Sequence, residues 1–199
     1  MKVKNWMKAD PVTIERTALL QEAAELMEEH AIRHLPVVEG EQLVGFITQT
    51  DLRQYFFPSM VEKIPVHEVM VVNPITIDVN SSIEKAARLI HDFKIGGLPV
   101  MDKKKLVGVI TSSDIVSGFI EVMGLLRSSM RLDVIIDKDG GVEDVTRIIN
   151  QHDIEILSVA SDSQPSRRKV FYFRLGRGEI DPVVSALEAA GHQVLSVMD

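Results

Sequence analysis

Within the first 124 residues, the pattern of apolar and polar positions changes period several times. Short apolar or alternating stretches predict β-strands, and longer stretches with apolar residues three and four apart predict amphipathic helices. Pro36, near the start of one predicted strand, indicates an edge or strand-entry position. The predicted strands are 12–14, 35–38, 42–47, 75–77, 98–101 and 105–110, and the predicted helices are 19–30, 48–57, 83–93 and 111–122. Each half therefore follows the order β-α-β-β-α.

The pattern after residue 124 is of a different kind. Strands are predicted at 132–136, 154–160, 170–175 and 193–198, with one helix beginning at 142 and another spanning 180–190. Pro182 in its first turn and Gly191 just beyond its end support the second helix. The order β-α-β-β-α-β is that of the split, ferredoxin-like arrangement. The fold class is thus α/β (α+β), with a domain boundary at 125–129 and a C-terminal domain at 129–199.

The first part of the chain is an internal duplication. Leu43-Val-Gly-Phe-Ile-Thr-Gln-Thr-Asp51 returns as Leu106-Val-Gly-Val-Ile-Thr-Ser-Ser-Asp114, and Met7 returns as Met70. The shift is 63 residues throughout, without a gap, and such self-similarity is the signature of repeated structural units. We place repeat 1 at 1–60 and repeat 2 at 64–124, separated by Pro58 and the stretch 59–65.

Composition and charge exclude several classes of function. The 199 residues include no cysteine, which rules out disulfides, thiolate zinc sites and a cysteine nucleophile and fits a cytoplasmic protein. A net charge of −7 opposes binding to a nucleic acid polymer. No uncharged run approaches the roughly 20 residues of a membrane span, and the first residues lack the apolar core of a signal peptide.

The chemistry-bearing residues do not form the pattern of an enzyme. The six histidines are scattered, with no pair at metal-ligand spacing on one helix, so we expect no metal site. No serine lies in a nucleophile elbow. The prediction is therefore a protein without catalytic residues that is not an enzyme.

The motif Thr-x-x-Asp occurs once in each repeat, as Thr48-x-x-Asp51 and Thr111-x-x-Asp114. A single copy reads as a capping box, in which the threonine and the acid satisfy each other's backbone amides at a helix start. Two copies, each directly after Gly-x-Ile, favour an additional role. A hydroxyl and a carboxylate at a helix N-terminus suit a polar ligand.

The repeats resemble the CBS domain family in its tandem form. The resemblance rests on Met-x-x-x-Pro-x-Thr-Ile, on Leu-Pro-Val and on Leu-Val-Gly-x-Ile-Thr-x-x-Asp, each present twice. It implies a regulatory module that binds AMP, ADP, ATP or S-adenosylmethionine in clefts between the repeats. By this resemblance, a carboxylate would accept hydrogen bonds from the ribose, a threonine would face phosphate or ribose, and an isoleucine would contact the base. The implied residues are Asp51 and Asp114, Thr48 and Thr111, and Ile14 and Ile77.

The repeats differ just before the Leu-Pro-Val strand. Arg33-His34 precedes it in repeat 1 and Gly96-Gly97 in repeat 2. A basic residue is common there in the family, so the cleft near Arg33 and His34 is the better candidate for a phosphorylated ligand. Gly97 and its neighbour either permit an unusual backbone or leave room for a bulkier ligand. The two clefts are therefore not expected to be equivalent.

Residues 131–199 resemble an ACT domain, through the order of elements and the turn Asp139-Gly140-Gly141. ACT modules bind amino acids with backbone groups of this first turn. The chain departs from that pattern, with Gly140 where proline is common and Glu143 where an apolar residue is usual. Amino-acid binding and a purely dimerising role both stay open. Tandem CBS followed by ACT resembles bacterial proteins linked to acetoin utilisation.

Two functions from different classes follow. The first is a homodimeric sensor whose regulatory ligand is an adenine nucleotide, with a regulated enzyme as a candidate partner. The second is a dimeric adaptor that does not bind a ligand.

Overall fold

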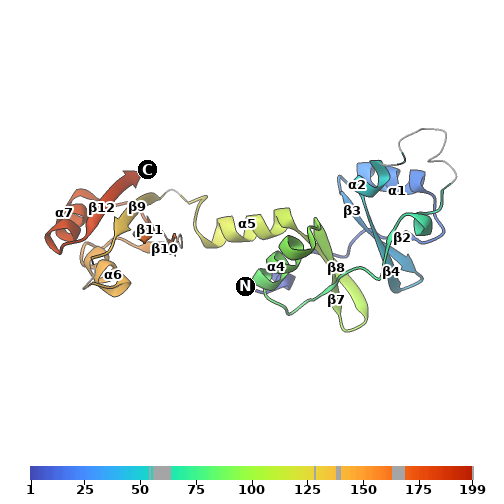
Figure 1. Cartoon of the computed structure of the whole chain (residues 1–199), viewed down its shortest axis with the longest axis horizontal. Helices are drawn as coiled ribbons and strands as arrows, with labels where there is room; N and C mark the ends of the chain where they lie inside the picture. The colour runs from blue at the N-terminus through green and yellow to red at the C-terminus, as the bar shows by residue number, and fades with distance from the viewer. Residues whose placement is uncertain (54, 56–63, 128, 138–139, 163–168, 199) are drawn as a thin grey trace. The chain divides into compact units, whose positions relative to one another are not determined.

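The computed structural model describes residues 1–53, 55, 64–127, 129–137, 140–162 and 169–198. The chain divides into two compact units, Met1–Val116 and Ser117–Asp199, each with its own set of contacts. Figure 1 shows the elements of both units.

The N-terminal unit contains every strand and helix expected from the two repeats. The predicted helix 48–57 is observed as far as Arg53, and residues 54 and 56–63, including Pro58, lie outside the described residues. Its elements are η1 Val3–Asn5, β1 Lys8–Ala9, β2 Ile14–Glu15, α1 Leu20–Glu29, β3 His34–Glu39, β4 Gln42–Thr48, α2 Gln49–Arg53, η2 Val66–Glu68, β5 Val71–Val72, β6 Ile77–Asp78, α4 Ile83–Phe93, β7 Gly97–Asp102, β8 Lys105–Thr111 and α5 Ser112–Val122, which continues into the C-terminal unit.

Each sheet of this unit takes one strand from the other repeat. The sheets have the orders β2-β3-β4-β5 and β1-β8-β7-β6. Strand β1 of repeat 1 pairs antiparallel with β8 of repeat 2, and β5 of repeat 2 pairs with β4 of repeat 1. The exchange extends to the segments before these strands, since the Val3 amide donates to Ser81 O and the Val66 amide to Ala18 O. Neither repeat therefore completes its own sheet.

A methionine of one repeat packs against the glycine of the other repeat's motif. A Cβ on Gly45 would collide with the side chain of Met70. A Cβ on Gly108 would lie 2.7 Å from Met7 Sδ and 2.8 Å from the backbone oxygen of Lys8. The glycine of Gly-x-Ile-Thr is thus required because the exchanged segment approaches it closely. This contact connects the glycine with the methionine of the distant Met-x-x-x-Pro motif.

The backbone repeats as faithfully as the sequence motifs. Residues with positive φ in this unit occur in pairs separated by 63 positions, although the residue types within a pair differ. The pairs are Asp10 (48°) and Asn73 (50°), Ala31 (51°) and Lys94 (55°), and Gly40 (61°) and Lys103 (56°). The left-handed conformation is unfavourable for alanine and lysine, so the shared fold sets it rather than the residue type.

Pro36 lies inside a sheet, but at a position where β3 is not yet paired with β2, so no backbone N–H is needed there for that pairing. Strand β3 is flanked by β2 and β4, and its pairing with β2 begins only at Val37. Pro36 pairs with Phe46 of β4 on the other side. The strand-entry alternative therefore describes this proline, which precedes the first residue paired with β2.

The C-terminal unit has the predicted element order. It contains β9 Met130–Ile135, α6 Val142–Gln151, β10 Ile156–Ser161, β11 Val170–Leu175, α7 Asp181–Ala189 and β12 Gln193–Met198. The antiparallel sheet has the order β10-β11-β9-β12. Alternate residues of β9, such as Leu132 and Val134, are fully buried in one cluster with Val145, Ile149 and Leu187 of the two helices. Both helices thus cover the same face of the sheet.

We expect Gly108→Ala to destabilise the N-terminal unit more than Gly45→Ala. At Gly108 the added methyl meets a backbone oxygen that is held in the β1–β8 pairing, whereas at Gly45 the three nearest atoms belong to a flexible methionine side chain. Overpacking of this kind costs about 1–3 kcal/mol, and Gly45→Ala should lie at the lower end. Chemical denaturation measures both values.

Gly176→Ala is the matched control for this comparison, because its Cβ would lie 3.4 Å from the nearest atom, an ordinary contact. Equal unfolding free energies for Gly108→Ala and Gly176→Ala would contradict the proposed role of the exchanged segment.

Candidate functional site

Among the described residues of the N-terminal unit, two clefts each contain one copy of the Thr-x-x-Asp motif. The first, which we call the Asp51 cleft, has a volume of about 520 Å³. The second, the Asp114 cleft, has a volume of about 420 Å³. Volumes of this size are typical of pockets for small molecules. The Asp51 cleft contains Thr48, Asp51 and Gly97, and the Asp114 cleft contains Asp114; Thr111 lines both.

The strand exchange makes each cleft from both repeats. The Asp51 cleft takes its motif from repeat 1, but Pro74 and Ile75 from repeat 2. The Asp114 cleft takes its motif from repeat 2, with Pro11 and Val12 from repeat 1. Residues far apart in the sequence thus provide the carboxylate and the apolar wall of the same cleft.

Both aspartates use one carboxylate oxygen for the local structure. Asp51 Oδ2 accepts hydrogen bonds from the Thr48 amide at 2.8 Å and from the Thr48 hydroxyl at 2.7 Å. Asp114 Oδ2 accepts the same two bonds from Thr111 at 2.8 and 2.6 Å. The predicted capping box is therefore formed in both repeats. The other oxygen, Oδ1, accepts no hydrogen bond from a described residue in either case.

Ile14 and Ile77 lie in the apolar cores and not in the described linings of the clefts. Ile14 is 5% exposed and packs with Leu20 and Leu35, and Ile77 is 2% exposed. In the same segments, the residues two positions earlier, Val12 and Ile75, line the clefts instead. The sequence placed an apolar contact in this segment, but only the fold decides which residue of it reaches the cleft.

Arg33 and His34 line both clefts and therefore do not single out one of them. His34 reaches both clefts because it lies against Gly96 and Gly97, the residues of repeat 2 that are equivalent to Arg33 and His34. A Cβ on Gly96 would lie 2.5 Å from His34 Nε2, and one on Gly97 would lie 3.3 Å from His34 Cδ2. The glycine pair of repeat 2 thus leaves the space that the imidazole of repeat 1 occupies.

His34 also stacks against Phe46. The two rings stack at a centroid distance of 5.8 Å and an interplanar angle of 24°. Burial, together with the charge of Arg33, lowers the pKa of His34 below its ordinary value, while Asp114 and Asp51 act in the opposite direction. The folded structure therefore favours the neutral imidazole, which lies within the electrostatic reach of both carboxylates.

Gly140 and Gly141, in the turn predicted as a possible amino-acid site, lie close to side chains of the unit itself. A Cβ on Gly140 would lie 2.7 Å from His192 Cε1, and one on Gly141 would lie 2.6 Å from Glu143 Oε2. The Asp137 amide also donates to His192 Nδ1 at 3.2 Å. Asp139 lies outside the described residues. Amino-acid binding at this turn stays a prediction.

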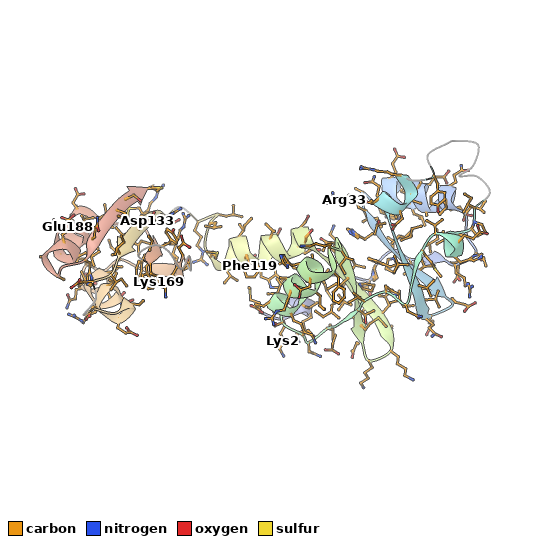
Figure 2. The ribbon with its side chains drawn as sticks, in the orientation of Figure 1. Lys2, Arg33, Phe119, Asp133, Lys169 and Glu188 are labelled. Atoms are coloured by element: carbon orange, nitrogen blue, oxygen red, sulfur yellow. The ribbon has the colours of Figure 1, made fainter. Side chains whose placement is uncertain are left out.

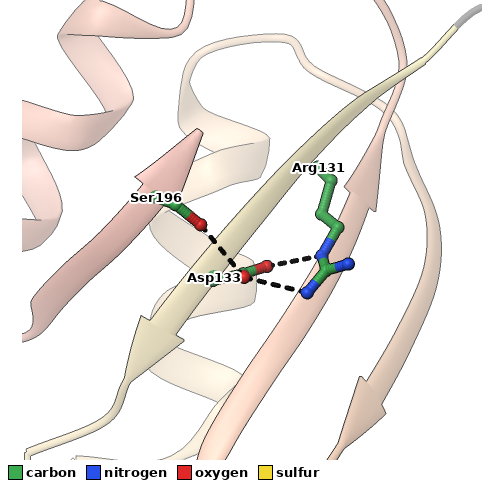
Figure 3. A network of polar contacts seen from close by, with 3 residues as sticks. All are labelled: Arg131, Asp133 and Ser196. Carbon is green, nitrogen blue, oxygen red and sulfur yellow. Dashed lines mark hydrogen bonds and ion pairs between the residues drawn. The ribbon is translucent and has the colours of Figure 1, made fainter. Parts of the chain in front are cut away.

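A polar cluster that the sequence did not indicate lies on the sheet of the C-terminal unit (Figure 3). Asp133, only 6% exposed, accepts bonds from Arg131 Nε at 2.7 Å and Nη2 at 2.9 Å, and from the Ser196 hydroxyl at 3.0 Å. The Arg131 guanidinium also lies 4.6 Å from the centre of the Tyr172 ring. The available signal was the alternation of Arg131 and Asp133 with buried residues along β9. Such alternation places both side chains on the face opposite the helices.

Two further properties concern only the described part of the chain. None of its helices has the length and apolar character that crossing a membrane requires. No three of its histidine, aspartate and glutamate side chains come together as metal ligands would.

Comparison with known families identifies the N-terminal unit. The family model of the CBS domain matches residues 3–57 and 66–121, which make up more than half of the chain. The chain therefore belongs to the CBS domain family. A CBS domain-containing protein of Dictyostelium discoideum is 37% identical over 134 residues, 61% of this chain and 92% of that protein. The L-aspartate semialdehyde sulfurtransferase of Methanocaldococcus jannaschii is 33% identical over 115 residues, 57% of this chain and only 22% of the enzyme.

Solved CBS structures resemble the same part of the chain. The CBS domain pair of protein MJ0100, in complex with 5′-methylthioadenosine and S-adenosyl-L-methionine, is 31% identical, with a TM-score of 0.55, and the match covers 60% of this chain and 95% of that one. CBSX2 in complex with AMP is 26% identical, with a TM-score of 0.54 and coverage of 61% and 97%. A candidate acetoin utilization protein (AcuB) from Vibrio cholerae is 35% identical, with a TM-score of 0.56 and coverage of 65% and 97%.

The lowered pKa of His34 predicts an effect of pH on stability. Because the unfolded chain binds this proton more readily than the folded one, the free energy of unfolding should fall as the pH drops below about 6.5, the ordinary pKa of histidine. His34→Gln should remove part of this fall between pH 7 and 5.5. Urea denaturation at several pH values measures the difference.

His91→Gln, which removes an exposed imidazole on α4, controls for the loss of a histidine as such. Identical pH profiles for the wild type and His34→Gln would show that protonation of the half-buried imidazole does not lower the free energy of unfolding.

Proposed function

We propose that this protein is a regulatory sensor that binds an adenosine-containing ligand in the Asp51 and Asp114 clefts. The observation that carries the proposal is the Oδ1 of each aspartate, which accepts no hydrogen bond from a described residue and lies at a cleft with an apolar wall. A ribose offers two neighbouring hydroxyl donors, and a carboxylate oxygen accepts them as charge-assisted bonds. The adenine ring would lie against the apolar wall, where burial of its faces is favourable.

The capping bonds support this role because they fix the carboxylate before a ligand arrives. Thr48 and Thr111 each hold Oδ2 through a hydroxyl and an amide, so the rotamer of the aspartate is set by its own helix start. A preorganised acceptor loses little conformational entropy on binding. AMP, 5′-methylthioadenosine and S-adenosyl-L-methionine, found in complex with similar CBS structures, share the adenosine group that such a site would recognise.

Contact to the base falls in this proposal to Val12 and Ile75, with Ile14 and Ile77 supporting them from the cores. Arg33 and His34 would serve both clefts, and Gly97 would contribute by leaving space. The regulatory output requires that the ligand prefers one conformation of the protein over another. The enzyme or pathway under control, including a link to acetoin metabolism, stays a prediction.

Substitution of the two aspartates tests the proposal. Asp51→Asn and Asp114→Asn should each weaken binding at their own cleft about 10- to 100-fold, because hydrogen bonds to charged groups contribute about 1.5–3 kcal/mol. Calorimetric titration of the wild type and the variants with AMP, ADP, ATP and S-adenosylmethionine measures this.

Two controls keep this test specific. Asp102→Asn removes an exposed carboxylate that lines neither cleft and should leave binding unchanged. Thermal melting of each variant separates a lost ligand contact from a weakened cap, which costs about 1 kcal/mol. If none of the four ligands binds to the wild type, the sensor proposal fails, and the adaptor function is the remaining alternative.

We further propose that the C-terminal unit is a ferredoxin-like, ACT-type domain that joins two copies of the chain. The element order and the strand order β10-β11-β9-β12 support the fold, and the contacts of Gly140 with His192 and of Gly141 with Glu143 favour dimerisation over amino-acid sensing. Strand β12 is an edge of the sheet, and it exposes the apolar residues Leu195, Val197 and Met198. An edge of this kind favours pairing with another chain.

The double substitution Leu195→Glu/Met198→Glu should therefore convert a dimer into a monomer of 22.2 kDa. Introduced charges at a paired edge oppose association because they lose hydration on contact. Light scattering after size exclusion measures the mass. Leu126→Glu, at a residue that is 85% exposed but not on β12, is the matched control. A wild type that is monomeric, or a double variant that stays dimeric, would overturn this arrangement.

A further inference from the structure

The two clefts carry different charges although they come from one duplicated unit. Among the described residues of the Asp51 cleft, Arg33, Arg53 and Lys94 stand against a single carboxylate. In the Asp114 cleft, Arg33 and Lys8 stand against two carboxylates, those of Asp10 and Asp114. Since Arg33 is common to both, the difference lies in the other residues.

The clearest difference is at two equivalent positions with the same backbone conformation. Lys94 and Ala31 follow the first helix of their repeats with φ values of 55° and 51°. Lys94 lines the Asp51 cleft and Ala31 lines the Asp114 cleft. The fold therefore presents the same position at each cleft, with a cation in one case and a methyl group in the other.

At two other pairs of equivalent positions, the difference also makes the Asp51 cleft more positive than the Asp114 cleft. Arg53 lines the Asp51 cleft, and its equivalent in repeat 2 is the neutral Val116. Asp10 lines the Asp114 cleft, and its equivalent is the neutral Asn73, with nearly the same φ. Lys8 in the Asp114 cleft acts in the opposite direction, but Asp10 follows it two residues later and offsets its charge.

We infer that the clefts divide the adenosine ligands by charge: the Asp51 cleft takes an adenosine polyphosphate, and the Asp114 cleft takes an adenosine derivative without phosphate. This inference rests on the proposed function and adds the ligand class of each cleft. Excess positive charge at the larger cleft attracts a polyanion, and the balanced charge of the smaller one gives a phosphate chain no net attraction. The protein would then sense two ligands at once.

Titration with ATP and 5′-methylthioadenosine, without Mg²⁺, tests this division. Each ligand should bind once per chain, and saturation with one should leave the site for the other open. Asp51→Asn should weaken ATP binding and Asp114→Asn should weaken methylthioadenosine binding. One-for-one displacement of methylthioadenosine by ATP, or the reverse assignment of the two aspartates, would overturn the inference.

Removal of the charges tests its physical cause. Arg53→Ala/Lys94→Ala should lower the ratio of ATP affinity to methylthioadenosine affinity about tenfold, as two exposed ion pairs would. The effect should shrink at 0.5 M salt because exposed charges are screened. Lys104→Ala/Lys105→Ala removes the same charge at exposed residues that line neither cleft and is the control. In the Asp51→Asn background, Asp10→Asn should strengthen the binding of ATP to the Asp114 cleft, because it removes a carboxylate from that cleft.

The outcomes separate this inference from the proposed function. If neither ATP nor methylthioadenosine binds, the division by charge fails, and the titrations with AMP, ADP and S-adenosylmethionine decide whether the proposed function stands. If both ligands bind in both clefts with similar affinities, or if the Arg53→Ala/Lys94→Ala variant keeps the wild-type ratio, the division by charge fails and adenosine binding stands.

Discussion

The N-terminal unit depends on the exchange of short segments between its two repeats. Strands β1 and β5 add only two residues each to a sheet, yet they bring Met7 onto Gly108 and Met70 onto Gly45. The exchange also carries Pro11-Val12 and Pro74-Ile75 to the carboxylate of the opposite repeat. The core packing and the composition of both clefts are therefore consequences of the same topology. A change that displaced an exchanged segment would disturb a sheet and a cleft together.

The duplication also explains why the two clefts differ. Where equivalent positions of the two repeats meet, they compete for the same space, and His34 can lie against Gly96 and Gly97 only because those residues have no side chains. One repeat therefore provides the imidazole and the guanidinium for both clefts. Elsewhere, equivalent positions such as Ala31 and Lys94 line different clefts and carry different charges. Close packing at the contact thus requires equivalent positions to differ, whereas Ala31 and Lys94 differ in charge at separate clefts.

In the proposed function, the aspartates connect stability with binding, because one oxygen of each carboxylate caps a helix and the other accepts no hydrogen bond from a described residue. In the C-terminal unit, by contrast, the two described polar residues that are buried, Asp133 and His192, have partners within the unit. Asp133 is bonded to Arg131 and Ser196, and His192 fills the space beside Gly140. Figure 2 labels Asp133 on this unit and Arg33 on the N-terminal unit. The two charged residues illustrate the difference: the first is bonded within its own sheet, and the second lines two clefts.

The sequence by itself determined the features that depend on neighbouring residues. The order of elements, the duplication with its shift of 63 residues and the bonds of Thr48 to Asp51 and of Thr111 to Asp114 follow from local periodicity and capping chemistry. The tertiary structure decided what depends on distant residues: the exchange of β1 and β5, the burial of Ile14 in place of Val12, and the sharing of His34 between clefts. A two-residue strand has too short a pattern to be recognised, and a contact between repeats has no fixed spacing along the chain. Only the packing of both repeats together makes those choices.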